Sequence, residues 1–121
     1  MCGIAGLVLA DGAQPLPKQL DRLVSAISHR GPDGEGRLTI GGTTLAHRRL
    51  AIIDLQTGDQ PFQDSYGTSL IANGEIYNYR ELTEKITDGV LSSKSDCELL
   101  LHLYRYHGLA FTEHLRGMYA L

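Results

Sequence analysis

This sequence contains few cysteines and carries a low net charge. It has 2 Cys in 121 residues, too few for the disulfide framework of a small secreted domain, so a reducing compartment is expected. The formal net charge is only −3 at pH 7. This disfavours a nucleic-acid partner, because such proteins carry a strongly basic face.

Long apolar runs are also missing. No stretch approaches the roughly 18 consecutive apolar residues of a membrane span. The apolar opening over residues 2–10 has no basic stretch before it and ends at Asp11 and Gly12, unlike a signal peptide. We therefore expect a cytoplasmic protein with no membrane partner.

Motifs for metals and nucleotides are absent as well. No G-x-x-x-x-G-K-[ST] loop occurs, so no nucleotide site of that type is expected. The spacing of the histidines matches no metal-ligand pattern, and we expect no metal site. These histidines are His29, His47, His102, His107 and His114.

Apolar spacing along the chain predicts a mixture of strands and helices. Leu20 and Val24 recur at helical spacing, and Pro32 cannot continue that helix. Gly41 and Gly42 lie between two short apolar runs, which is typical of a two-residue hairpin loop. The mixture predicts an α+β fold in one domain. The expected elements are a buried strand over 4–10, a helix over 15–28, a hairpin over 37–47, helices over 79–86, 92–107 and 111–115, and a strand beginning at 118.

The most regular helical pattern is SSKSDCELLLHLYRYHG. Ser95 and Glu98 have the spacing of a capping box, in which each side chain accepts a hydrogen bond from the backbone of the other residue. Gly108 follows the last periodic residue and suits the C-cap. We therefore expect this helix to begin directly after Ser95.

Cys2 is the first candidate for chemistry, and two interpretations stay open. It is either a small buried hydrophobe at the start of a strand or a nucleophile. Removal of Met1 would give Cys2 a free α-amine with an ordinary pKa of about 7.7–8.0. Such an amine can act as a general base near neutral pH.

Three further positions each allow a structural and a functional interpretation. Asn73 and Gly74 form either a type I′ hairpin turn or an oxyanion site, in which the Asn amide and the Gly N–H donate. Arg49 is either half of a solvated basic pair or a bidentate ligand for a carboxylate. Asp96 suits the first turn of a helix in any case, and it could also bind an ammonium group.

Seven ordered motifs resemble one family. They are MCGIAG, SHRGPDGEG, LAHRRLAIIDL, GDQPF, NGEIYNYRELTE, SDCE and FTEHLRGMYAL. Together they resemble the amino-terminal glutaminase domain of asparagine synthetases, which are class II (N-terminal nucleophile) glutamine amidotransferases. The resemblance covers residues 1–121. It implies an αββα sandwich of two antiparallel sheets, incomplete in this chain because the family's domain is longer. The synthetase half, where the family binds ATP and Mg²⁺, is absent, and no cofactor is expected for the glutaminase half.

The resemblance also implies a role for each candidate residue. Cys2 would be the nucleophile and its own α-amine the base, with Asn73 and Gly74 as the oxyanion hole. Arg49 would bind the α-carboxylate of glutamine, and Glu75 and Asp96 its α-ammonium group. The segment that lines the site would be Leu50, Ala51, Ile52 and Ile53.

The expected function is that of a glutaminase, which releases ammonia from glutamine through a Cys2 thioester for asparagine synthesis on the C-terminal domain. A second enzyme hypothesis keeps Cys2 but uses His29 or His47 as base. A third is a non-catalytic binding module or thiol sensor. The apolar strand at the end of the chain, MYAL, favours association because unpaired edges pair readily, so a homodimer is also expected.

Overall fold

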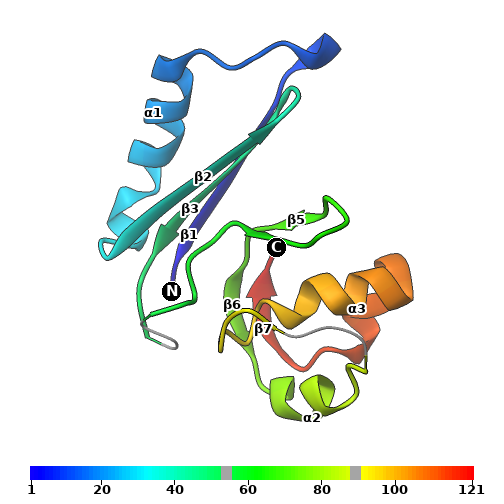
Figure 1. Cartoon of the computed structure of the whole chain (residues 1–121). Coiled ribbons are helices and arrows are strands. Elements are labelled where there is room, and N and C mark those ends of the chain that lie inside the picture. The colour runs from blue at the N-terminus through cyan, green and yellow to red at the C-terminus, as the bar shows by residue number, and fades with distance from the viewer. Residues whose placement is uncertain (53–55, 88–90) are drawn as a thin grey trace.

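The computed structural model describes residues 1–52, 56–87 and 91–121. Helices and strands are mixed along the chain, and within these ranges the strands form three small antiparallel sheets (Figure 1). The α+β class is therefore confirmed. In chain order the elements, with η for 3-10 helices, are β1 (Gly3–Val8), η1 (Ala10–Gly12), α1 (Pro17–Ala26), η2 (Ser28–Arg30), β2 (Gly34–Ile40), β3 (Thr43–Arg49), β4 (Phe62–Gln63), β5 (Ser69–Leu70), β6 (Asn73–Ile76), α2 (Tyr79–Glu84), α3 (Leu99–His107), η3 (Gly108–His114) and β7 (Gly117–Ala120).

The largest sheet has the strand order β1-β3-β2. Ile40 pairs with Thr43 across the two-residue loop, so the predicted hairpin is confirmed. The helix α1 lies along one face of this sheet (Figure 1). It buries Val24 there, together with Thr44 and Ala46 of the central strand.

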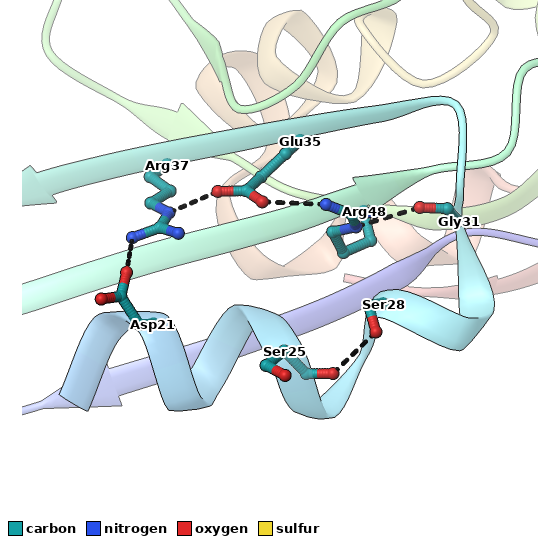
Figure 2. Close-up of polar contacts among 7 residues, drawn as sticks. All are labelled: Asp21, Ser25, Ser28, Gly31, Glu35, Arg37 and Arg48. Atoms are coloured by element: carbon teal, nitrogen blue, oxygen red, sulfur yellow. Dashed lines mark hydrogen bonds and ion pairs between the residues drawn. The ribbon is translucent and has the colours of Figure 1, made fainter. Parts of the chain in front are cut away.

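Ion pairs tie the α1 side of this sheet together (Figure 2). Arg37 contacts Asp21 of α1 at 2.9 Å and Glu35 at 2.6 Å. Arg48 contacts the same Glu35 at 2.8 Å and donates a hydrogen bond to the Gly31 carbonyl at 3.0 Å. Successive strand residues point to opposite faces of a sheet. Arg49, the residue after Arg48, therefore points to the face away from α1.

The second core packs around α3, on the other side of the molecule (Figure 1). Leu99 and Leu100 of α3 are fully buried, as is Ile76 of β6. The strand β7 pairs with β6 in register, Asn73 opposite Ala120. The apolar strand expected at residue 118 therefore has a partner within the chain.

Three local features differ from what the sequence suggested. The strand over 4–10 is not buried: β1 lies at the edge of its sheet, and Val8 is 75% exposed. Of the two interpretations left open for Asn73 and Gly74, the hairpin turn is excluded, because both residues belong to β6 and pair with β7. The short strands β4 and β5 were not predicted, since two residues are too few to show an alternating pattern.

The capping box predicted for Ser95 and Glu98 does not form. The helix α3 begins at Leu99, and Glu98 has no side-chain capping bond. Its carboxylate instead accepts hydrogen bonds from Ser92 and Ser93, further back in the chain. The C-cap is confirmed, because Gly108 has the positive φ of 56° that favours glycine. Among the helices of the described ranges, none has the length and apolar character needed to cross a membrane.

Candidate active site

A cleft of about 150 Å³ opens between the start of β1, the end of β3 and the start of β6. Of the ten residues predicted for the site, eight line it: Cys2, Arg49, Leu50, Ile52, Asn73, Gly74, Glu75 and Asp96. Ala51 does not line the cleft, and Ile53 lies outside the described residues. The fold therefore gathers four segments that are up to 94 positions apart in sequence (Cys2 and Asp96); the roles of the residues stay predictions.

The thiol of Cys2 lies against the backbone of Leu50. The Leu50 N–H donates to Sγ at 3.4 Å, and Sγ lies 3.7 Å from the Leu50 carbonyl oxygen. Cys2 is half-buried, so its sulfur is held by the chain and still reaches the cleft. This placement suits a nucleophile, because a reacting thiol needs both a fixed position and access to its substrate.

Asp33 holds the backbone on both sides of Leu50. Its N–H donates to the Arg49 carbonyl at 2.9 Å, and its Oδ2 accepts from the Ala51 N–H at 2.9 Å. The sequence reasoning did not single out Asp33, although it lies in the quoted motif SHRGPDGEG. We infer that this motif supports the segment that contacts the Cys2 thiol.

Arg49 is buried, and its guanidinium faces Asp59. The side chain is 9% exposed, and Nη1 lies 2.7 Å from Asp59 Oδ1. The neighbouring arginine, Arg48, pairs with Glu35 on the opposite face. The two arginines of this pair therefore differ in environment, and only Arg49 lines the cleft. Sequence reasoning missed Asp59, which lies in the quoted motif GDQPF.

Gly36 of β2 makes room for the chain that covers this face of the sheet. A Cβ at Gly36 would lie 1.7 Å from the carbonyl oxygen of Gln60. Gln60 in turn accepts a hydrogen bond from the Ala72 N–H at 2.6 Å through Oε1. This contact fixes the residue directly before Asn73, so Gly36 acts on the cleft through Gln60.

Asn73 and Gly74 enter the cleft from β6. A Cβ at Gly74 would lie 2.3 Å from the Met118 carbonyl oxygen, so β7 itself requires glycine there. The Oδ1 atom of Asn73 is buried and has no hydrogen-bond partner in the described part of the chain. A buried polar atom without a partner costs about 1–3 kcal/mol, which marks Asn73 as a place where a ligand can supply the missing contact.

Asp96 and Cys97 form the far wall. Asp96 is 5% exposed, and its Oδ2 accepts a hydrogen bond from the Ile76 N–H at 2.8 Å. Burial and the neighbouring Asp96 carboxylate raise the pKa of the Cys97 thiol to about 12. The Cys97 thiol is therefore unreactive near neutral pH, because the thiolate is the nucleophilic form. In the described ranges no group of three or more His, Cys, Asp or Glu could hold a metal ion.

His47 also lines the cleft, whereas His29 is exposed in η2. Burial and the positive charge of Arg49 lower the pKa of His47 from 6.5 to about 4, although Asp59 and the Ala72 backbone act in the opposite direction. Its Nε2 is buried without a hydrogen-bond partner among the described residues. The imidazole is therefore neutral at pH 7.

The lowered pKa of His47 predicts a loss of stability in mild acid. An unfolded His binds a proton below about pH 6.5, while the folded one resists protonation down to about pH 4. His47 therefore favours the folded state fully only above about pH 6.5. The free energy of unfolding should fall by about 2 kcal/mol between about pH 7.5 and about pH 5, because the unfolded state gains a proton there and the folded state does not. Urea unfolding at both pH values measures this. His47→Gln should flatten the dependence, and His29→Gln, at an exposed histidine, should not; an equally steep fall in His47→Gln would contradict the assignment.

Comparison with known proteins shows the family of this chain. A family model described as a glutamine amidotransferase domain matches residues 1–121. A glutamine-hydrolyzing asparagine synthetase of Asparagus officinalis is 41% identical over 122 residues, which cover 99% of this chain and 21% of that protein. Asparagine synthetase 2 of Bacillus subtilis is 38% identical over 127 residues, covering 100% of this chain and 17% of that protein. Asparagine synthetase 2 of Arabidopsis thaliana is 42% identical over 122 residues, with coverages of 99% and 21%. The chain thus spans about a fifth of the length of these relatives, and it belongs to the glutamine amidotransferase domain family.

Proposed function

We propose that this chain is the glutaminase part of a glutamine-hydrolysing asparagine synthetase. The observation that carries the proposal is the cleft itself, which gathers Cys2, Arg49, Asn73 and Asp96 from four separate segments. The names of the relatives, all glutamine-hydrolyzing asparagine synthetases, support glutamine as the substrate. In the longer protein the ammonia would pass to a C-terminal synthetase region for asparagine synthesis. The sandwich of two antiparallel sheets belongs to the same proposal.

The chemistry begins at the Cys2 sulfur. The α-amine of Cys2, free once Met1 is removed, takes the thiol proton, and the thiolate forms an S–C bond to the glutamine carboxamide carbon. The resulting oxyanion accepts hydrogen bonds from the Asn73 amide and the Gly74 N–H. The C–N bond then breaks, and the Cys2 ammonium gives its proton to the departing ammonia. Water hydrolyses the thioester, which releases glutamate and restores the thiol.

Two features favour the α-amine over histidine as the base. His47 lies at the cleft, but a pKa of about 4 makes it a weak proton acceptor at pH 7. His29 is exposed and lies outside the cleft lining. An unperturbed α-amine has a pKa of about 7.7–8.0, close to the working range of a general base.

The charges around the cleft suit a free amino acid. Arg49 is positive, while Glu75 and Asp96 are negative, and all three line the same cavity. The α-carboxylate of glutamine would bind Arg49 and its α-ammonium the two acids. A peptide-bound glutamine lacks both charges, so this arrangement would select the free amino acid.

Trapping of the thioester tests the proposal. The full-length protein is mixed with glutamine, quenched in acid and digested, and the N-terminal peptide is examined by mass spectrometry. We expect a glutamyl group on Cys2, its loss in Cys2→Ala, and its retention in the matched variant Cys97→Ala. A glutamyl group on Cys97, or none on an enzyme that hydrolyses glutamine, would refute the Cys2 thioester.

Arg49→Lys tests the carboxylate site. A lysine ammonium keeps the charge but cannot reproduce the planar, bidentate fork of arginine. Loss of a charge-assisted hydrogen bond of about 1.5–3 kcal/mol predicts a rise in KM for glutamine of about tenfold or more. Steady-state kinetics measure it. Arg48→Lys, on the opposite face of the sheet, is the matched control and should leave KM unchanged; an unchanged KM in Arg49→Lys would remove Arg49 from the binding site.

A further inference from the structure

Glu98 is a buried acid that the proposed mechanism does not use. It is 7% exposed, directly before α3. Its Oε1 accepts from the Ser92 N–H at 2.8 Å and from the Ser92 hydroxyl at 2.6 Å. Its Oε2 accepts from the Ser93 N–H at 2.6 Å and from the Ser93 hydroxyl at 2.5 Å. Both carboxylate oxygens are therefore committed to two consecutive serines.

These bonds continue toward the cleft. The Ser93 hydroxyl oxygen accepts from the Ser95 N–H at 3.2 Å, and the Ser95 hydroxyl oxygen accepts from the Cys97 N–H at 3.2 Å. Ser95, Asp96 and Cys97 all line the cleft. The turn that carries Asp96 is thus held from behind by Glu98 through Ser93, and from the front by the bond between Asp96 and the β6 backbone.

The charge of Glu98 matters to this arrangement. Burial raises the pKa of Glu98, but the hydrogen bonds from Ser92 and Ser93 outweigh it and hold the pKa below its usual value. The side chain is therefore an anion at pH 7. A carboxylate can accept from all four donors, whereas a neutral amide offers only one oxygen and places an NH₂ group against the other serine.

We propose that Glu98 is a positioning residue for glutamine binding: through Ser92 and Ser93 it fixes the turn that presents the Asp96 carboxylate to the α-ammonium group. The inference rests on the proposed function, because it assigns the ammonium to Asp96. Glu98 itself does not line the cleft. Its effect on the reaction is transmitted by the turn over residues 92–97.

Glu98→Gln in the full-length protein is the test. A displaced Asp96 would bind the α-ammonium group less tightly, and by the same amount in the ground state and in the transition state. The KM for glutamine should therefore rise about fivefold to tenfold while kcat stays within about twofold. Glu84→Gln, at an exposed position of α2, is the matched control and should change neither. Ser93→Ala keeps Glu98 but removes one hydroxyl donor to its carboxylate and the acceptor of the Ser95 N–H. It should raise KM in the same direction by about twofold to threefold, and it decides the question if Glu98→Gln does not fold.

A second substrate separates positioning from a general structural defect. 4-Carbamoylbutanoate is glutamine without the α-amino group, so it cannot use Asp96. We expect its KM to be the same in the wild type and in Glu98→Gln. Combining Glu98→Gln with Asp96→Asn should add nothing to the effect of Asp96→Asn alone, because both changes act on one contact.

Different results would contradict the positioning role of Glu98, its link through Asp96, and the proposed function. An unchanged KM for glutamine in both Glu98→Gln and Ser93→Ala would refute the positioning role, as would an equal rise in KM for the substrate without an amino group. Additive effects with Asp96→Asn would refute the link through Asp96. If the wild-type protein itself hydrolyses no glutamine, the proposed function has failed rather than this inference.

Discussion

Glutamine hydrolysis should disappear in a protein that retains Met1, while asparagine synthesis from added ammonia should continue. A retained Met1 converts the α-amine of Cys2 into a peptide nitrogen, which is not basic enough to take the thiol proton. Met1 also lines the cleft, so it would occupy space that the substrate needs. In the proposed full-length protein the synthetase reaction with ammonia would not involve the thiol, so we expect it to be unaffected.

Two measurements check this expectation together. Intact-protein mass spectrometry reports whether Met1 is present, and parallel assays use glutamine or ammonium as the nitrogen source. Met1 can be retained by cell-free synthesis without methionine aminopeptidase. The protein made with this enzyme, which lacks Met1, is the control. Cys2→Ala should reproduce the same pattern, because it removes the nucleophile and keeps the synthetase. Full glutaminase activity with Met1 in place would instead favour a histidine base, and His47 would be the candidate at the cleft.

Asn73→Ala should lower kcat for glutamine hydrolysis by about 10²–10³-fold with little change in KM. Removal of one oxyanion-hole donor costs that much because the bond forms fully only in the transition state. Asn73 lines the cleft, and its amide oxygen has no hydrogen-bond partner among residues 1–52, 56–87 and 91–121, so within these ranges that atom adds no hydrogen bond to the fold. Stopped assays of glutamate and of ammonia measure the loss.

A matched asparagine outside the cleft separates catalysis from folding. Asn78 donates to the His114 carbonyl at 3.0 Å and accepts from the Arg116 N–H at 2.9 Å. Asn78→Ala should therefore lower the melting temperature and leave kcat nearly unchanged, the opposite of Asn73→Ala. If Asn73→Ala keeps kcat within a few-fold, the Asn–Gly pair serves only to join β6 to β7.

Sequence patterns were informative wherever a few neighbouring residues decide the structure. The helical spacing of Leu20 and Val24 predicted α1. The pair Gly41 and Gly42 predicted the hairpin between β2 and β3. Gly108 ended α3 because the chain needs a positive φ there. Five of the eight predicted residues that line the cleft were candidates from residue type and position: Cys2, Arg49, Asn73, Gly74 and Asp96. Leu50, Ile52 and Glu75 came only from motif resemblance, which carries long-range information that periodicity lacks.

Where a local motif and a distant partner compete, the sequence alone could not choose. Asn73 and Gly74 have the sequence of a hairpin turn, but backbone pairing with residues 119–120 makes them a strand. Glu98 has the spacing of a capping box, yet it bonds Ser92 and Ser93 because those two residues offer four donors to a buried carboxylate.

Local patterns determined the α+β class, the hairpin and the end of α3, since these depend on backbone propensities within a few residues of each other. Sequence analysis named Arg49 as the candidate, but only the tertiary structure shows that Arg49 faces the cleft and Arg48 does not. Arg48 and Arg49 are chemically identical neighbours, and strand alternation sends them to opposite faces. Arg48 pairs with Glu35 beside α1, whereas Arg49 is buried next to Asp59 at the cleft. The physical reason is that α1 covers one face of the sheet and the residues around Gln60 cover the other.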